Sequence, residues 1–215
     1  MQIRGAIFDM DGTLIDSMEM WSTIGSAYIR SIGKVPKEDI DRRFSSMGVH
    51  EAAVFMKEEY DIAETREEIT ETIHKRVEKS YFETIPLKKG VVEFLEYIDS
   101  KNIPMCIATA TDEYMADAVL ERLGIRKFFK GIFTSRSVGQ GKDKPKIFLE
   151  GARLLGTEPS ETAVFEDSVV AIRTANAAGF YTAAVFDKSF EYAWEEIKEI
   201  ASVWHDDLTG YMGKF

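Results

Sequence analysis

A short stretch close to the start of the chain decides the fold: Arg4-Gly5-Ala6-Ile7-Phe8-Asp9-Met10-Asp11-Gly12-Thr13. Its apolar run ends abruptly at two aspartates, which is typical of a buried strand in a parallel sheet. Residues two apart in an extended chain point to the same side, so Asp9 and Asp11 can converge on one spot, and Gly12 lets the backbone turn beside them. Open α/β sheets bind ligands beyond the carboxyl ends of their strands. The pair is therefore a candidate site, although a solvated acidic turn would have the same residues.

The composition bounds the class of protein and its partners. The 215 residues are 45% hydrophobic and 30% charged, a balance typical of a soluble globular chain with one large domain, or a core and a smaller insertion. The net charge of −10 argues against nucleic acid or an anionic membrane as the main partner. With no targeting signal and no segment long and apolar enough to span a bilayer, we expect a cytoplasmic protein. The single cysteine, Cys106, is predicted to be a buried thiol.

Helical spacing dominates the chain after the first strand. Ser17 is positioned to cap a helix that runs from about residue 18 to residue 32 and stops at Gly33. The following pattern stays helical, and no strand pattern appears before residue 85. We therefore predict that residues 17–85 form an all-helical cap domain inserted after the first strand.

Strands and helices alternate over the rest of the chain. Apolar runs predict strands at 104–108, 131–133, 163–165 and 182–186, with an edge strand after 203. Helical patterns lie between them, at 91–98, 113–123, 146–155, 170–178 and 192–200. This alternation predicts an α/β core, a Rossmann-like doubly wound parallel sheet formed by residues 1–16 and 86–215. The helical insert is expected to cover the carboxyl edge of that sheet as a lid that excludes water.

Polar residues follow four of the predicted strands, where a parallel sheet would bring them to one edge: Asp9 with Asp11, Thr109, Lys142, and Glu166 with Asp167. Taken alone, each has a simpler explanation, since Thr109 could cap the next helix and the Lys142 loop could be solvated. Taken together, they form two acidic clusters, a hydroxyl and a cation. Carboxylates this close would repel one another if all were ionised, and Mg²⁺, which prefers oxygen ligands, would relieve the repulsion. A phosphoryl group would complete such a site, because a carboxylate can attack phosphorus.

In order and spacing, these residues resemble the four motifs of the haloacid dehalogenase superfamily. Asp9-Met10-Asp11-Gly12-Thr13 is the most specific motif. The segment Phe165-Glu166-Asp167-Ser168 resembles the last motif of the branch that contains phosphoglycolate phosphatase and β-phosphoglucomutase. The resemblance covers nearly the whole chain, including the helical cap. It implies a Mg²⁺-dependent phosphatase that acts on a small phosphorylated metabolite through an aspartyl-phosphate. Whether the protein is a monomer or a small homo-oligomer stays open.

The resemblance also implies a role for each site residue. Asp9 would be the nucleophile and a metal ligand, and Asp11 the general acid/base that lends its main-chain carbonyl to the metal. Asp167 would bind the metal, and Glu166 beside it would either bind the metal too or contact its ligands. The phosphoryl group would be held by Thr109, the Ala110 amide and Lys142. Dehalogenation is disfavoured, because the members of the superfamily that cleave carbon–halogen bonds lack the second aspartate.

The phosphate-binding lysine has two candidates in the sequence. The family usually carries Lys-Pro shortly before an Ile-Phe pair, and counting back from Ile147-Phe148 leads to Lys142. Lys144-Pro145 imitates the usual dipeptide but comes two residues later. A shift of two residues would rotate the following helix, so we predict Lys142.

Two other functions stay open. A phosphomutase of the β-phosphoglucomutase type would carry a histidine in the first cap helix, where this chain has Trp21, and cations around the cap loop, where it has Met47 and His50. These three cap residues are candidates for contact with the leaving group. Ordinary packing is the favoured explanation for Met47 and explains Trp21 equally well, and an exposed cap residue without a role would look like His50. A phosphate-sensing module with a slowly hydrolysed aspartyl-phosphate is the other alternative, and the large helical insert argues against it.

Overall fold

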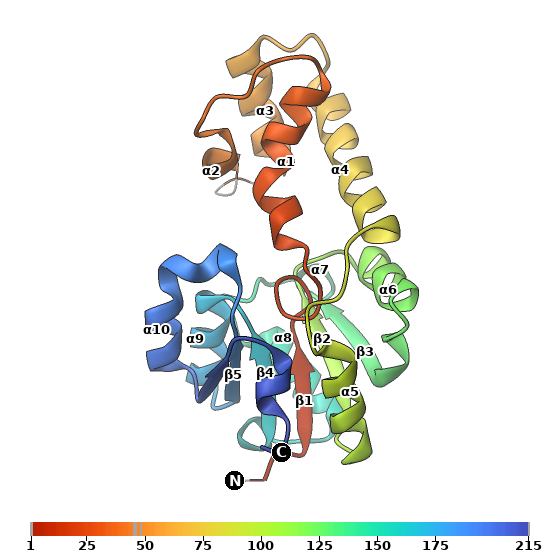
Figure 1. Ribbon diagram of the computed structural model, residues 1–215, viewed down its shortest axis with the longest axis vertical. Coiled ribbons are helices and arrows are strands. Elements are labelled where there is room, and N and C mark those ends of the chain that lie inside the picture. Colours follow the sequence, from red (N-terminus) through yellow and green to blue (C-terminus); the bar gives the residue numbers. More distant parts are fainter. Residues whose placement is uncertain (1, 45–46, 48, 215) are drawn as a thin grey trace. The chain divides into compact units, whose positions relative to one another are not determined.

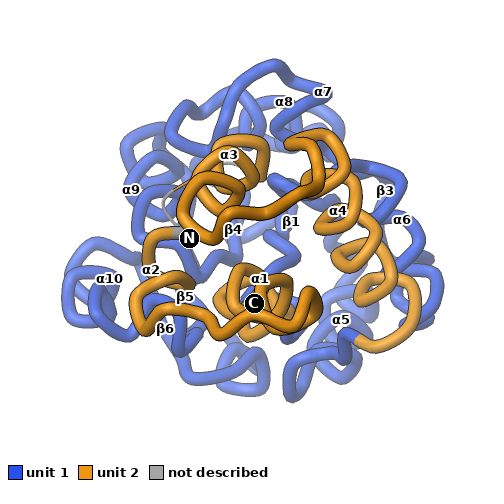
Figure 2. Tube along the Cα trace, turned by 90° about the horizontal axis from the view of Figure 1, so that it is seen from above, with its two compact units in different colours: residues 1–16, 85–215 blue, residues 17–84 orange. Residues whose placement is uncertain are grey.

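The computed structural model describes residues 2–44, 47 and 49–214 of the chain. By its internal contacts the chain divides into a core unit, residues 1–16 with 85–215, and a helical unit, residues 17–84 (Figure 2). The helical unit is thus inserted directly after the first strand, and it ends one residue before the boundary expected from the sequence. Its place over the sheet edge stays a prediction.

The core unit contains a parallel sheet with helices on both faces (Figure 1). The strands that the structure describes are β1 Gly5–Phe8, β2 Met105–Thr109, β3 Phe129–Thr134, β4 Thr162–Glu166, β5 Tyr181–Val185 and β6 Val203–His205. They lie side by side in the order β3-β2-β1-β4-β5-β6. This order reverses direction between β1 and β4, which is the position where doubly wound sheets bind their ligands. The predicted fold class is confirmed.

Alternating side chains of β1 enter two different cores. Phe8 stacks on Phe165 of β4, with ring centroids 4.5 Å apart, and both contact Phe94 of helix α5, Val91–Ser100. Ile7 points to the opposite face, into a cluster with Cys106 of β2 and the helices α8, Lys146–Leu155, and α9, Val169–Ala177. A strand buried on both faces is apolar throughout, which explains why the run preceding Asp9 carries no alternation.

A glycine lets helix α8 pack closely against the sheet. A Cβ placed on Gly151 would come within 2.8 Å of Ile7 Cδ1 and 3.1 Å of Cys106 Sγ. Burial raises the pKa of the Cys106 thiol to about 12, so this cysteine is a neutral packing residue, as predicted. The close approach matters for function, since the loop that leads into α8 carries Lys142.

The remaining core helices connect the strands: α6 Glu113–Arg122, α7 Ser135–Val138 and α10 Trp194–Ile200, with short 3₁₀ segments between them. The last predicted helix differs from the structure, because a 3₁₀ turn, Lys188–Ala193, precedes α10. The side chain of Asp187 starts this turn by accepting a hydrogen bond from the amide of Ser189. None of the helices in the described part of the chain has the length and apolar character needed to cross a membrane.

The helical unit contains α1 Met18–Ser31, α2 Ile40–Phe44, α3 Val49–Tyr60 and α4 Arg66–Glu83. Its described residues include no strand, as predicted. Thr65 and Glu68 form a capping box at the start of α4. The expected cap at α1 is wrong in detail. Ser17 occupies the N-cap position, but its backbone has helical angles, φ −100° and ψ −12°, and its side chain makes no capping hydrogen bond.

Candidate active site

The predicted site residues come together within the core unit. Asp9 follows β1, Thr109 ends β2, and Glu166 and Asp167 lie at the end of β4. The register pairs Phe8 with Phe165, and the Asp9 amide donates to the Phe165 carbonyl at 2.9 Å, so the two acidic segments leave the sheet side by side. The site therefore lies where the strand order reverses.

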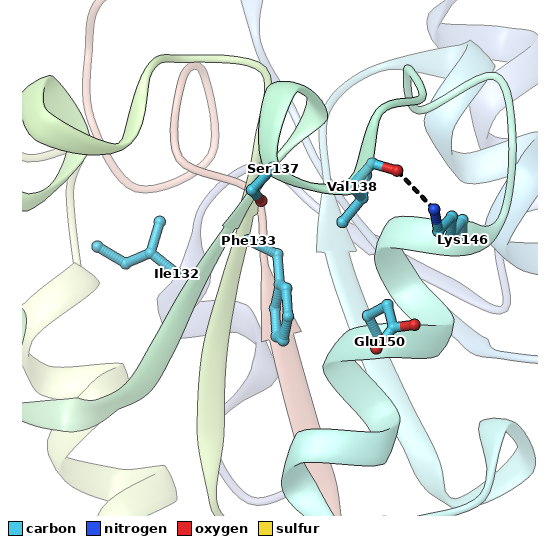
Figure 3. Close-up of a pocket in the computed structure, with 6 residues that line it drawn as sticks. All are labelled: Ile132, Phe133, Ser137, Val138, Lys146 and Glu150. Atoms are coloured by element: carbon cyan, nitrogen blue, oxygen red, sulfur yellow. Dashed lines mark hydrogen bonds between the residues drawn. The ribbon is translucent and has the colours of Figure 1, made fainter.

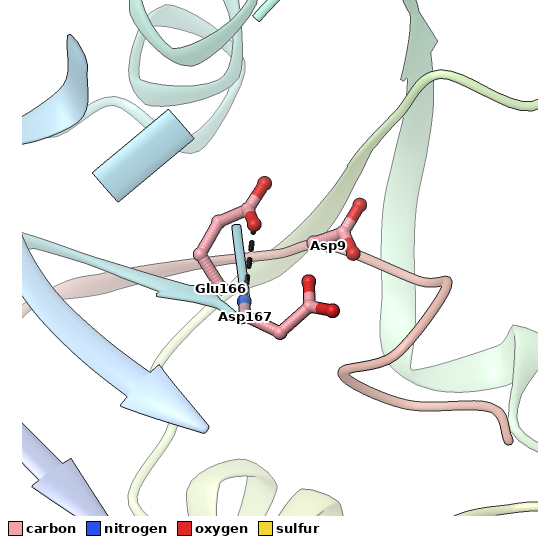
Figure 4. Close-up of side chains that lie close together, drawn as sticks. All are labelled: Asp9, Glu166 and Asp167. Carbon is pink, nitrogen blue, oxygen red and sulfur yellow. Dashed lines mark hydrogen bonds between the residues drawn. The ribbon is translucent and has the colours of Figure 1, made fainter. Parts of the chain in front are cut away.

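Three buried carboxyl groups form the centre of the site. Asp9, Glu166 and Asp167 each offer an oxygen, and these oxygens lie within 4.8 Å of one another (Figure 4). Glu166 is 1% exposed and is fully engaged, because Oε2 accepts from the amides of Asp167 and Ser168 at 3.1 and 3.0 Å. Its other oxygen, Oε1, accepts from Lys142 Nζ at 2.6 Å.

Lys142 joins the two acidic segments. Its Nζ also donates to Asp9 Oδ1, and its side chain is only 13% exposed. Lys144, the alternative lysine, is 64% exposed and forms an ion pair with Asp143 at 4.0 Å. The structure therefore brings Lys142 to the acidic cluster and leaves Lys144 at the surface.

Asp11 is held by two hydroxyl groups from the end of β2. Thr111 Oγ1 donates to Asp11 Oδ2 at 2.7 Å, and Thr109 Oγ1 approaches the same oxygen at 3.5 Å. The Thr111 amide donates to Thr109 Oγ1 at 3.1 Å, which fixes the threonines relative to each other. Thr109 is thus not a helix cap, since the N-cap residue of α6 is Asp112. Ala110 lies between the threonines and is exposed.

Burial and crowding shape the ionisation of these groups. Burial, with smaller contributions from Glu166 and Asp11, raises the pKa of Asp9 to about 8 against the opposing effect of Lys142. Burial and the neighbouring carboxylates Asp9 and Glu166 also hold the pKa of Asp167 well above its usual range. Desolvation would lower the pKa of Lys142, but its two acidic partners outweigh that effect and raise it. Lys142 alone does not balance the three carboxyl groups.

The donor set fits a hard divalent cation. Asp167 Oδ2 is buried and finds no hydrogen-bond partner among the residues that the structure describes. A buried polar atom without a partner is strongly unfavourable, so it marks a place where a ligand completes the site. Carboxylate oxygens are what Mg²⁺ prefers, and Asp9 and Asp167 could hold it, together with the main-chain oxygen of Asp11 expected from the sequence.

The three predicted cap residues lie in the helical unit. Trp21 donates from its indole nitrogen to Tyr81 Oη at 3.1 Å and packs edge-on against that ring, so packing within the unit accounts for it. Met47 is half-buried, and His50 is exposed on α3. Contact of these residues with a substrate stays a prediction.

A cavity beside β3 is a less suitable place for the chemistry (Figure 3). It is lined by Ile132, Phe133, Ser137, Val138, Lys146 and Glu150. Its charged groups are already engaged, because Lys146 donates to the Val138 carbonyl at 2.7 Å and Glu150 accepts from Arg153 at 2.9 Å. The acidic cluster is therefore the candidate active site.

The structure adds three residues that the sequence reasoning missed. Thr111 contacts Asp11, and a partly buried lysine, Lys88, forms an ion pair with Asp187 at 2.7 Å beside the loop that carries Asp11. The two-residue spacing between Thr109 and Thr111 at the end of a strand could have indicated Thr111. The pairing of Lys88 with Asp187 spans 99 residues and leaves no local signal in the sequence.

The family model described as haloacid dehalogenase-like hydrolase matches residues 3–179. The chain therefore belongs to the haloacid dehalogenase-like hydrolases, as its motifs predict.

Known relatives and structures agree with this family. The chain is 30% identical to the phosphorylated carbohydrates phosphatase of Thermotoga maritima over 177 residues, which are 82% of each chain. It is 31% identical to hexitol phosphatase A of Escherichia coli K12, covering 86% of this chain and 84% of the relative. The crystal structure of a candidate beta-phosphoglucomutase from T. maritima superposes with a TM-score of 0.83 at 28% identity, covering 95% and 94% of the two chains. CbbY from Rhodobacter sphaeroides, in complex with phosphate, shares the fold with a TM-score of 0.76 at 20% identity, covering 98% and 97%.

Proposed function

We propose that this protein is a Mg²⁺-dependent phosphatase that hydrolyses a small phosphomonoester, such as a sugar or polyol phosphate, through an aspartyl-phosphate on Asp9. The observation that carries the proposal is the buried group of Asp9, Lys142 and Asp167 where the strand order reverses, with Asp11 held beside it. The named phosphatases among its relatives act on small phosphorylated compounds, which supports this substrate class.

In the first step, an Asp9 carboxylate oxygen attacks phosphorus and the bond from phosphorus to the alcohol oxygen breaks. Protonated Asp11 donates its proton to the departing oxygen, which leaves as an alcohol. The hydrogen bond from Thr111 to Asp11 Oδ2 keeps this carboxyl group oriented during the transfer. Lys142 neutralises charge on the transferred phosphoryl oxygens, and Thr109 and the Ala110 amide donate hydrogen bonds to them.

In the second step, water attacks the phosphorus of the aspartyl-phosphate. Asp11, now ionised, takes a proton from the water, and the bond from phosphorus to the Asp9 oxygen breaks. Inorganic phosphate forms, and both aspartates return to their starting states. When bound by Asp9 and Asp167, Mg²⁺ would supply positive charge that offsets the crowded carboxylates and the phosphoryl oxygens.

A phosphomutase is the second candidate, favoured by the similarity to the candidate beta-phosphoglucomutase structure. The two reactions share the aspartyl-phosphate and differ in its acceptor. Incubation with β-glucose 1-phosphate and its bisphosphate separates them, because a mutase forms glucose 6-phosphate whereas a phosphatase releases free phosphate.

The direct test is a panel of phosphomonoesters assayed for phosphate release with Mg²⁺ and with a chelator. The panel includes hexitol phosphates, fructose 1-phosphate and pseudouridine 5′-phosphate, after the names of relatives. We expect Mg²⁺-dependent release, lost in Asp9→Asn and kept in Asp206→Asn, which changes an exposed carboxylate. Equal turnover with and without Mg²⁺, or an active Asp9→Asn variant, would contradict the proposal.

A further inference from the structure

A second partly buried lysine, Lys88, touches the loop that carries the catalytic aspartates. Lys88 Nζ donates to the Gly12 carbonyl at 2.5 Å, to the Phe186 carbonyl at 2.9 Å and to Asp187 Oδ2 at 2.7 Å. Its side chain is only 15% exposed, and a lysine side chain is rarely this inaccessible unless it has a specific partner. All three donor positions of the ammonium group are therefore used.

Both ends of this ion pair are held in place. The Lys88 amide donates to the Leu14 carbonyl at 2.9 Å, next to an antiparallel bridge between Ile15 and Leu87. Asp187 Oδ1 accepts from the amide and the hydroxyl of Ser189 at 2.9 and 2.7 Å. Burial alone would raise the pKa of Asp187, but the hydrogen bonds from Lys88 and Ser189 outweigh it and hold that pKa below its usual value. Lys88 and Asp187 are thus both held in a position from which the ammonium group reaches the Gly12 carbonyl.

Gly12 needs such a restraint. Its φ is +86°, in the region that favours glycine, and glycine has no side chain to limit its rotation. Its amide donates to the Ile15 carbonyl at 3.0 Å. Because a trans peptide is planar, this bond turns the Asp11 carbonyl the opposite way. The bond from Lys88 fixes the peptide on the other side of Gly12, so the glycine is restrained at both of its polar groups.

We infer that Lys88, held by Asp187, is a positioning residue that fixes the Gly12 carbonyl and thereby the orientation of the preceding Asp11. The inference deepens the proposed function, on which it rests for the role of Asp11. Lys88 acts on the backbone of the loop, whereas Thr111 acts on the Asp11 side chain. An ion pair that served folding alone would not need its third bond to the catalytic loop.

The neighbouring lysine offers a matched control. Lys89 also pairs with an aspartate, Asp207, at 2.7 Å, but its side chain is 81% exposed. We expect Lys88→Met to lower kcat about tenfold or more, with KM changed less than about threefold, because a small misplacement of the acid/base acts on the chemical step. Lys89→Met should keep both constants within about twofold of the original protein.

The second readout is amide hydrogen exchange, measured on the protein without substrate or metal. We expect exchange of a peptide spanning residues 10–15 to become about tenfold faster in Lys88→Met and to stay unchanged in Lys89→Met. This measurement stands even if no phosphomonoester is hydrolysed. A failure of the proposed function therefore leaves the positioning claim testable by itself.

The double variant Lys88→Met/Asp187→Asn guards against loss of folding, since it leaves no unpaired buried charge. We expect it to keep the low kcat and the fast exchange, because the Gly12 carbonyl is still unrestrained. Asp187→Asn alone should change kcat and amide exchange less than Lys88→Met does, because the amide oxygen of the new asparagine can still accept a hydrogen bond from Lys88. Return of the double variant to the kcat and exchange of the original protein would overturn the inference, and so would unchanged exchange in Lys88→Met.

Discussion

At Asp11, hydroxyl groups of two threonines hold one oxygen of the side chain. Oδ2 accepts from Thr111, and Thr109 Oγ1 lies 3.5 Å from the same oxygen. A general acid/base has to present one oxygen to the leaving group and later to water, so a rotamer fixed by hydroxyl groups favours proton transfer. Asp9, the proposed nucleophile, differs, because its partner is a cation that lowers the repulsion around it.

Replacement of Thr111 tests whether its hydrogen bond to Asp11 supports proton transfer. Thr111→Val should lower kcat with a sugar phosphate by about 10- to 100-fold, the equivalent of about 1.5–3 kcal/mol for a bond to a charged group. Kinetics with p-nitrophenyl phosphate should show a smaller loss, because p-nitrophenolate leaves without a proton. Thr111→Ser keeps the hydroxyl and should restore most of the activity. Equal losses in the valine and serine variants would show that packing, and not the hydrogen bond, matters.

The pKa of Asp9 predicts how stability depends on pH in the absence of metal. Its folded-state pKa, about 8, lies above the ordinary value of 3.8, so the folded protein binds this proton more tightly than the unfolded chain. Stability from this group is therefore full at low pH and is lost as pH rises from about 4 to about 8. Urea unfolding of the metal-free protein should show this decline.

Asp9→Asn removes the titrating group. We expect its free energy of unfolding at pH 8 to exceed that of the original protein by at least about 1 kcal/mol, with a smaller difference at pH 4. Asp206→Asn provides an exposed control. If the free energy of unfolding of Asp9→Asn depended on pH in the same way as that of the original protein, the raised pKa of Asp9 would be contradicted.

At the scale of elements, the position of α8 decides which lysine reaches the site. Gly151 allows this helix to lie against Ile7 and Cys106, and Pro145 is its N-cap residue. Lys142, four residues before the first residue of the helix, therefore reaches Asp9, and Lys144 points to solvent.

The two lysines make a matched pair for mutation. Lys142→Ala should lower kcat/KM by about 100-fold or more, because it removes the positive charge between Asp9 and Glu166 and leaves both carboxyl groups without their cationic partner. Lys144→Ala should stay within about twofold, since exposed ion pairs contribute little. Steady-state kinetics with one phosphomonoester measures both. A larger loss in Lys144→Ala would show that the loop has the other register.

The elements also show what the sequence could and could not predict. Buried apolar runs predicted the strands of the sheet, because strands covered on both faces leave a continuous signal. The turn at Lys188–Ala193 was missed, since its start depends on the Asp187 side chain. The polar site residues at the strand ends could be predicted as well, because each of them ends or follows one of these apolar runs. Lys88 was not, because its contacts to Gly12 and Asp187 join distant parts of the chain that only the folded sheet brings together.

For the whole molecule, a metal ion bound at the acidic cluster would raise the free energy of unfolding. A cation that binds the folded state stabilises it by mass action, by about 2.7 kcal/mol at 100 times its Kd, or a Tm increase of about 5–10 °C for a chain of this size. Calorimetry with Mg²⁺ should show this rise at pH 8. Asp167→Asn should abolish it, because it neutralises the carboxyl group whose Oδ2 has no hydrogen-bond partner among the described residues, and Asp206→Asn should retain it. The same rise in Asp167→Asn would exclude this cluster as the metal site.

The central claim is that Asp9 carries the phosphoryl group. Asp11→Asn with p-nitrophenyl phosphate tests it most directly, because the first step needs no acid for this leaving group while the second step lacks its base. The aspartyl-phosphate should therefore accumulate. After an acid quench, peptide mass spectrometry should find one phosphoryl group on the peptide containing Asp9, removable by hydroxylamine as expected for an acyl-phosphate. Phosphorylation of a different residue, or turnover by Asp11→Asn/Asp9→Asn equal to that of Asp11→Asn, would contradict the account.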